Sequence, residues 1–287
     1  MGCVRRFNYW LSVAICLCAP LMAQADTLSI PPAKDNTLFS TGGTTSNGAG
    51  DAVFSGRTGV MGGGVRQRAV LAFDVAGSLE AGAMVTSVSL TLWLIDAPGG
   101  GGQTHALHRI LADWGEGTSS GFGGTGAPAT PGDATWLHTF WPDQFWASEG
   151  CDIDAVASGI QIVGTAPDFY TWASTPQMVA DVQGWLDSPE SNFGWLIQGN
   201  ESDLFTARKF ASREHDPELF RPELTIEYSI PQSCPQDLDN DGTVGAADLA
   251  ILLGNWGACA GCPADFDADG FVNAADLAVL LGNWGLC

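Results

Sequence analysis

The sequence predicts a mainly β protein: a jelly-roll-like β-sandwich with one helix, followed by a small α-helical module built from two loop-helix repeats. Three observations predict this organisation. Short apolar segments separated by glycine-rich turns fill the range 26–228, one capped amphipathic segment interrupts them, and one acidic phrase occurs twice near the C-terminus. With 287 residues and 45% hydrophobic residues, the chain can form one large domain with its own core and a small second one.

Five segments of the larger part carry β-branched and aromatic residues, partly in alternation. They are RQRAVLAFDV (66–75), MVTSVSLTLWLID (84–96), SGIQIVGT (158–165), FGWLIQGN (193–200) and PELTIEY (222–228). Such segments are typical of strands buried on one face, and several of them together favour a sandwich.

The segment TPQMVADVQGWL predicts the single helix of this part. Thr175 is the expected N-cap and Pro176 suits the first turn. An apolar stripe follows at helical spacing, made of Met178, Val179, Val182, Trp185 and Leu186. We expect this helix to pack over an end of the sandwich.

The first 25 residues are typical of a secretory signal peptide that ends at Ala25. Arg5 and Arg6 precede an apolar run too short to span a bilayer, and a small-residue cleavage site follows it. We therefore expect a secreted or extracellular protein without a membrane span. The formal net charge of −21 argues against nucleic acid as a partner.

The segment DLDNDGTVGAADLAILLGNWG is nearly repeated 28 residues later as DFDADGFVNAADLAVLLGNWG. In a twelve-residue calcium loop, positions 1, 3, 5 and 12 supply carboxylates, position 6 is glycine, and position 7 supplies a backbone carbonyl. The matching residues are Asp237, Asp239, Asp241, Thr243 and Asp248 in the first copy and Asp265, Asp267, Asp269, Phe271 and Asp276 in the second. A single acidic turn can simply be solvated, but the duplication favours two calcium ions.

Proline precedes both loops, so each unit is a loop followed by one helix, of the form D-x-[DN]-x-D-G-x-V-x-x-x-D-L. This pattern resembles the type I dockerin module and covers residues 234–287, after a linker at 229–233. The resemblance implies two calcium ions, an antiparallel pair of helices with pseudo-twofold symmetry, and docking to a cohesin-like protein.

Dockerins usually carry a Ser-Thr type pair at loop positions 10 and 11 and basic residues about five places later. This chain has neither feature. Ala246-Ala247 and Ala274-Ala275 take the place of the Ser-Thr type pairs, and Leu253-Gly254 and Leu281-Gly282 take the place of the basic residues. The repeated Trp256 and Trp284 fit either caps on a small core or contacts with a partner.

Four cysteines of the module, Cys234, Cys259, Cys262 and Cys287, also repeat at the 28-residue offset and indicate two disulfides in a secreted domain. A redox or zinc role for the Cys-x-x-Cys is disfavoured, because this region has no histidine. Similarity to dockerins, in which the ends of the module meet, implies the pairs Cys234–Cys287 and Cys259–Cys262. Cys151 is left over, and burial or pairing between chains are both open.

Landmarks across the larger part are AKDNTLFS, RAVLAFDV, GAMVTSVSLTLWL, DVQGWL, FGWLIQG, FASRE and RPELTIEY. Together they resemble a DNRLRE-type domain over residues 26–228, although DNTLFS matches the name-giving motif loosely. The resemblance implies a jelly-roll-like sandwich. Some relatives are carbohydrate-binding modules, including ones that bind the acidic polymer alginate.

Candidate ligand-binding residues follow two chemistries. Trp141 and Trp146, in a long connecting segment, could stack on sugar rings, while Lys209 and Arg213 could bind the carboxylates of an acidic polysaccharide or pair with nearby acids. We expect Trp114 and Trp136 to be core residues.

No nucleophile elbow, zinc-protease motif or phosphate loop is present in the sequence, so we predict no catalytic residues. The expected function is a secreted, non-catalytic protein that binds or displays at a polysaccharide surface. The alternatives are an adhesive or structural surface protein that binds no sugar and a polysaccharide hydrolase or lyase, whose acid pairs leave no sequence signature.

Overall fold

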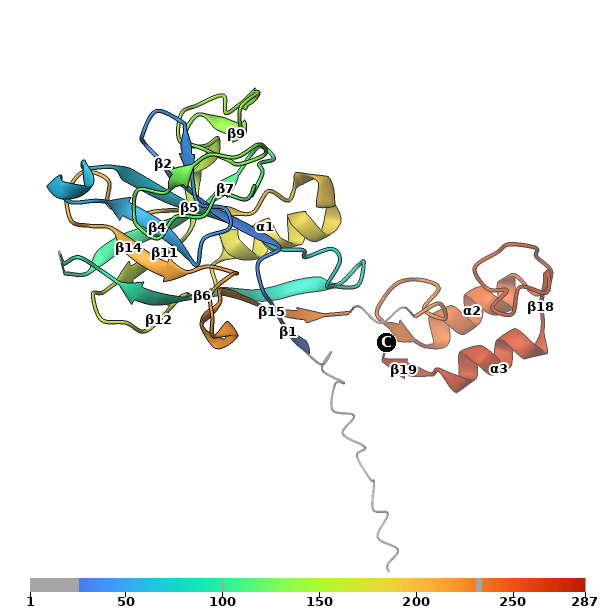
Figure 1. Cartoon of the computed structure of the whole chain (residues 1–287). Coiled ribbons are helices and arrows are strands. Elements are labelled where there is room, and N and C mark those ends of the chain that lie inside the picture. The colour runs from blue at the N-terminus through green and yellow to red at the C-terminus, as the bar shows by residue number, and fades with distance from the viewer. Residues whose placement is uncertain (1–25, 100, 231–233, 287) are drawn as a thin grey trace, which may run out of the picture. The chain divides into compact units, whose positions relative to one another are not determined.

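The computed structural model describes residues 26–99, 101–230 and 234–286, which form two compact units (Figure 1). The described part of the larger unit runs from Asp26 to Ile230 and that of the smaller unit from Cys234 to Leu286. The predicted signal peptide lies outside the described residues, as does most of the predicted linker. Ser229 belongs to the last strand of the larger unit, so this unit extends beyond the expected end at Tyr228. None of the helices in the described ranges is both long and apolar enough to cross a bilayer.

The larger unit is mainly β, as predicted. Its long strands are β1 (Asp26–Ile30), β2 (Lys34–Phe39), β4 (Ala52–Arg57), β5 (Arg66–Ala72), β6 (Met84–Asp96), β7 (Gln103–Ile110), β11 (Ile153–Val163), β12 (Phe169–Trp172), β13 (Trp195–Gln198), β14 (Arg208–Ala211) and β15 (Glu223–Ser229). Short strands are β3 (Thr45–Ser46), β8 (Ala127–Pro128), β9 (His138–Phe140) and β10 (Gln144–Phe145), with 3-10 turns at Val60–Gly62, Pro189–Ser191 and Glu218–Phe220.

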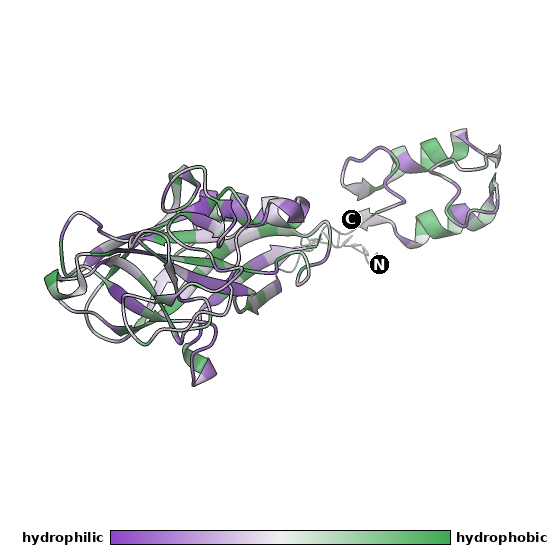
Figure 2. Ribbon diagram, turned by 45° about the horizontal axis from the view of Figure 1, so that its top comes forward, coloured by the Kyte–Doolittle hydropathy of each residue, from purple (hydrophilic) through white to green (hydrophobic). Residues whose placement is uncertain are grey.

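The long strands form one curled antiparallel sheet with the order β1-β15-β6-β14-β4-β5-β13-β7-β11. Strand β12 adds to β6, and β2 adds to β5. Strand β4 pairs with β14 on one side and, through Gly56 and Arg57, with β5 on the other, so it joins the two halves of the curl. Hydrophobic and hydrophilic residues alternate along many of these strands (Figure 2).

The main core lies inside the curl. Leu90, Leu92 and Leu94 of β6 are fully buried there together with Trp195 and Ile197 of β13. Strand β5 is buried on both faces: Ala69 and Leu71 belong to this core, whereas Val70 and Ala72 belong to a second cluster on the opposite face. The segment 111–152 supplies much of that second cluster, including Trp114, Trp136, Trp146 and Cys151.

Helix α1 (Pro176–Asp187) confirms the predicted helix and its cap. The Thr175 hydroxyl accepts a hydrogen bond from the Met178 amide at 3.0 Å. Met178, Val182, Trp185 and Leu186 of the expected stripe are buried in the main core. Asp181 is buried as well, and its carboxylate accepts a hydrogen bond from the indole N–H of Trp195 at 2.8 Å.

The smaller unit contains β16 (Thr243–Val244), α2 (Ala246–Gly254), β17 (Gly257–Ala258), β18 (Phe271–Val272), α3 (Ala274–Gly282) and β19 (Gly285–Leu286). Strand β16, before α2, pairs with β19, after α3; strand β18, before α3, pairs with β17, after α2. The start of each helix therefore lies beside the end of the other, which makes the helices antiparallel. A small core, to which Val244, Leu252, Val272 and Leu280 contribute, lies between the repeats.

Candidate functional site

The first acidic loop of the smaller unit brings three predicted calcium ligands together. Asp237, Asp239 and Asp248 each place a carboxylate oxygen within 4.8 Å of the others. The Asp237 carboxylate accepts from the amides of Asp241 and Gly242, at 3.1 Å and 2.9 Å, so it also closes the turn. Gly242 has a φ of +87°, which is why glycine is needed at this position. Asp241 lies outside the close set, and its Oδ1 accepts from the Thr243 amide at 2.9 Å.

The second loop repeats this geometry with a different close set. Here Asp265, Asp267 and Asp269 place their oxygens within 4.8 Å of one another. Asp265 accepts from the amides of Asp269 and Gly270, at 3.2 Å and 2.9 Å, as its counterpart does in the first loop. Gly270 has a φ of +89°. Phe271, at position 7, is exposed and pairs through its backbone with Ala258.

The position-12 acids, Asp248 and Asp276, are the buried carboxylates of the two loops. Asp248 accepts from the amides of Leu238 and Gly245, both at 2.7 Å. Asp276 accepts in the same way from Phe266 at 2.7 Å and Asn273 at 2.8 Å. Burial raises the pKa of both carboxyls, but the backbone N–H donors outweigh it and leave each pKa below its usual value. Each acid thus ties its loop to the first turn of the following helix.

The arrangement concentrates negative charge. Asp239 is exposed, but partial loss of hydration and the neighbouring carboxylates of Asp241, Asp248 and Asp237 raise its pKa. Oxygen-only donor sets of this kind suit hard cations such as Ca²⁺, which takes six to eight oxygen ligands. Each loop could hold one ion through its carboxylates and the backbone carbonyl of its position-7 residue, which is Thr243 in the first loop and Phe271 in the second.

Cys259 and Cys262 form a disulfide, as predicted. The expected partner of Cys234 is Cys287, which lies outside the described residues, so the second pair stays a prediction. Cys151 is buried and is a free thiol in this structure, and burial raises its pKa well above the usual value.

The outer surface of the smaller unit is apolar at repeated positions. Ala246, Ala247, Ala274 and Ala275, at the helix starts, are exposed. Leu253 and Leu281 are each 51% exposed, and Trp256 and Trp284 are 50% and 49% exposed. Both tryptophans therefore keep about half of their surface in solvent, where a partner could contact them.

Trp141 and Trp146, the candidates for stacking on sugar rings, differ in their exposure to solvent. The interpretation of Trp146 as a surface residue was wrong: it is only 6% exposed, it packs in the second cluster, and its indole N–H donates to the Thr135 carbonyl at 2.9 Å. Trp141 is partly exposed and remains available for contact. Trp114 and Trp136 are buried, as predicted.

The candidate basic residues do not share a strand. Lys209 is in β14, but the strand ends at Ala211, so Arg213 lies in the following turn. The Arg213 guanidinium binds Glu116 through two hydrogen bonds, at 2.6 Å and 3.0 Å, and approaches Glu214 at 2.9 Å. Lys209 forms a long ion pair, 3.9 Å, with the Asp51 carboxylate, and its ammonium group lies 6.0 Å from the centre of the Phe54 ring. It lines a cavity of about 280 Å³ with Phe54, Gln67, Asp96 and the exposed Phe122.

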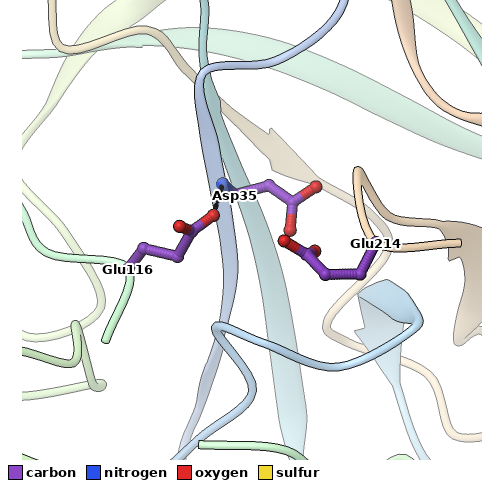
Figure 3. Close-up of side chains that lie close together, drawn as sticks. All are labelled: Asp35, Glu116 and Glu214. Atoms are coloured by element: carbon purple, nitrogen blue, oxygen red, sulfur yellow. Dashed lines mark hydrogen bonds between the residues drawn. The ribbon is translucent and has the colours of Figure 1, made fainter. Parts of the chain in front are cut away.

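Sequence reasoning missed a third acidic cluster, made of Asp35, Glu116 and Glu214 (Figure 3). Asp35 and Glu214 belong to AKDNTLFS and FASRE, which stood out in the sequence only as structural landmarks, and Glu116 lies two residues after the predicted core residue Trp114. An acid in or beside each of three widely separated structural segments was the available signal.

Comparison with protein-family models finds no match for this chain, and comparison with curated proteins finds none either.

Proposed function

We propose that this is a secreted, non-catalytic protein in which a calcium-binding, dockerin-like unit displays a polysaccharide-binding β unit. In this proposal the larger unit is a jelly-roll-like sandwich of the DNRLRE type. The smaller unit takes up two calcium ions and docks to a protein partner.

The repetition of one loop geometry 28 residues apart carries the proposal. In both loops the position-1 aspartate caps the turn, the position-6 glycine has a positive φ, and the position-12 aspartate is buried against backbone donors. Asp248 and Asp276 also cap the starts of α2 and α3 by accepting from the N-cap amides, but helix capping alone does not require the three acids at positions 1, 3 and 5 that precede each of them. Calcium ligation accounts for all four, because the last ligand must reach back from the helix to the loop.

Calorimetric titration of the full chain with calcium tests this part. We expect two ions to bind at these loops, and the double variant Asp237→Ala/Asp265→Ala to lose both. The matched control Asp143→Ala/Asp187→Ala removes the same number of carboxylates from the larger unit. Loss of two ions in the control, or binding of as many ions by the loop variant as by the unaltered chain, contradicts the assignment.

The apolar surface of the smaller unit supports a protein partner. Alanines and half-exposed leucines and tryptophans occur at equivalent places in both repeats. A partner that contacts this surface would itself be apolar there. Docking modules with hydroxyl and basic side chains at these positions would instead select a partner with a polar and acidic surface. A cohesin-like protein with an apolar docking face fits this description.

For the larger unit, Lys209 is the residue best placed to contact an acidic glycan. Its ammonium group lies beside a cavity with an exposed aromatic ring, Phe122, which is 99% exposed. The long contact with Asp51 leaves the ammonium group free to exchange partners. Single contacts of this kind contribute little, so affinity should be modest, about micromolar to millimolar, and display of several copies would raise it.

Retention on immobilised alginate and on neutral polysaccharides tests this part. We expect Lys209→Ala to abolish binding to the acidic polymer and salt to weaken it, while the control Arg221→Ala leaves it intact. Binding that resists salt and fails in Trp141→Ala would instead assign stacking on sugar rings. Retention on no polysaccharide favours the adhesive alternative, and new reducing or unsaturated ends would show an enzyme.

A further inference from the structure

Three carboxylates from distant parts of the chain meet in the larger unit. Asp35 lies in β2, Glu116 in the segment after β7, and Glu214 in the turn after β14. Each offers an oxygen within 4.8 Å of the other two. Figure 3 shows the carboxylates of Asp35 and Glu214 directed toward each other.

Two oxygens of this cluster are buried without a hydrogen-bond partner within the described chain, namely Asp35 Oδ1 and Glu214 Oε2. Asp35 is entirely buried. A buried carboxylate oxygen without a donor is costly, and the carboxylates of Asp35 and Glu214 also repel each other. A group that supplies positive charge to both would remove this cost.

The nearby cations do not supply enough charge. Arg213 binds Glu116 and Glu214 and compensates one of the three negative charges. Lys34, the residue before Asp35, is turned away and binds Asp113 at 2.8 Å and the Trp114 carbonyl. With the three acids ionised, the cluster and Arg213 together carry a charge of −2, which one divalent cation would neutralise.

The surrounding backbone holds the acids in place. The Asp35 amide donates to Glu116 Oε1 at 2.8 Å, and the Arg213 amide donates to Asp35 Oδ2 at 2.7 Å. The Asn36 side chain donates to the Glu116 carbonyl at 3.0 Å. Gly48 packs so closely that a Cβ there would lie 1.6 Å from the same carbonyl. The cluster is therefore preorganised.

We propose that Asp35, Glu116 and Glu214 form a third divalent-cation site, selective for calcium, that joins β2, the segment after β7 and the turn after β14. Two oxygens bound to one Ca²⁺ at 2.3–2.6 Å lie at most about 5 Å apart, so oxygens within 4.8 Å of one another are close enough to share one ion. The donors are all oxygens, and carboxylates without a rigid octahedral cage favour Ca²⁺ over Mg²⁺. The site would cross-link segments that lie 81 residues apart for Asp35 and Glu116.

The test uses the full chain with Asp237→Ala/Asp265→Ala, which separates this site from the two loops. Calorimetry with calcium should show one bound ion in this background. Adding Asp35→Asn or Glu214→Gln should remove it, whereas the exposed control Glu218→Gln should not. One ion that persists in folded Asp35→Asn and Glu214→Gln variants overturns the proposal, because it binds elsewhere.

A second measurement does not depend on the folding of these variants. With the cluster intact in the same background, calcium should raise the melting temperature of the larger unit, followed by near-UV circular dichroism of its buried tryptophans, by several degrees. Magnesium at the same concentration should raise it less. No calcium-dependent shift would show that the acids are neutralised in another way, and would overturn the proposal.

Discussion

Replacing Asp248 by alanine should destabilise the smaller unit by about as much as its whole folding free energy. The carboxylate accepts two hydrogen bonds of 2.7 Å from the backbone amides of Leu238 and Gly245. Hydrogen bonds to a charged group contribute about 1.5–3 kcal/mol each, so losing both costs about 3–6 kcal/mol. A core of this size rarely supplies more than about 3–5 kcal/mol. Any lost calcium affinity adds to this cost.

Hydrogen exchange measured by mass spectrometry on the full chain, in saturating calcium, resolves this effect by segment. Amides of α2 should lose protection roughly 100-fold or more in Asp248→Ala, because each 1.4 kcal/mol is a factor of ten. Strands of the larger unit should be unchanged. Asp276→Ala should reproduce the loss in α3, since its carboxylate has the equivalent bonds.

The matched control is Asn255→Ala at the end of the same helix. Its exposed side chain donates one hydrogen bond to the Ile251 carbonyl at 2.8 Å, so its removal should cost only about 1 kcal/mol. If Asp248→Ala changes the exchange of α2 no more than this control does, the buried carboxylate does not have the role assigned to it.

Three further predictions concern the larger unit. Burial lowers the pKa of His105 to about 4, below its unfolded value near 6.5, so the unfolded state takes up a proton at a higher pH than the folded state does. The free energy of unfolding should therefore fall by roughly 3 kcal/mol as the pH drops from 6.5 to 4. In denaturant titrations, His105→Gln should flatten this pH dependence. Burial also raises the pKa of the Cys151 thiol, so it should react with a disulfide reagent only after denaturation, and fast labelling of the folded chain would refute its burial. Trp146→Ala should cost about 3–5 kcal/mol and Trp141→Ala much less, as measured by urea unfolding; equal effects would contradict their different exposure.

Local pattern predicted the regular elements of the fold well. Strand β6 spans Met84–Asp96, the expected segment, because its alternation is uninterrupted over its length. The helix that follows Thr175 has its cap and its apolar stripe adjacent in sequence. The loop acids of the smaller unit were identifiable as candidate ligands because the acids of a calcium loop follow a fixed spacing within one short segment.

Residues whose role depends on tertiary contacts were not predictable in this way. Trp146 is buried because the segment 111–152 folds onto the outer face of β5, and no periodicity in that segment indicates this. Arg213 is tied to Glu116 because a turn after β14 meets a loop 97 residues away. The same separation concealed the cluster of Asp35, Glu116 and Glu214.

The most direct test of the calcium assignment is an anomalous difference map from crystals of the full chain grown with calcium. The account predicts one peak in each loop of the smaller unit, bonded to the carboxylates of Asp237 and Asp239 in the first and of Asp265 and Asp267 in the second. Density for water alone at both places, at saturating calcium, would contradict it.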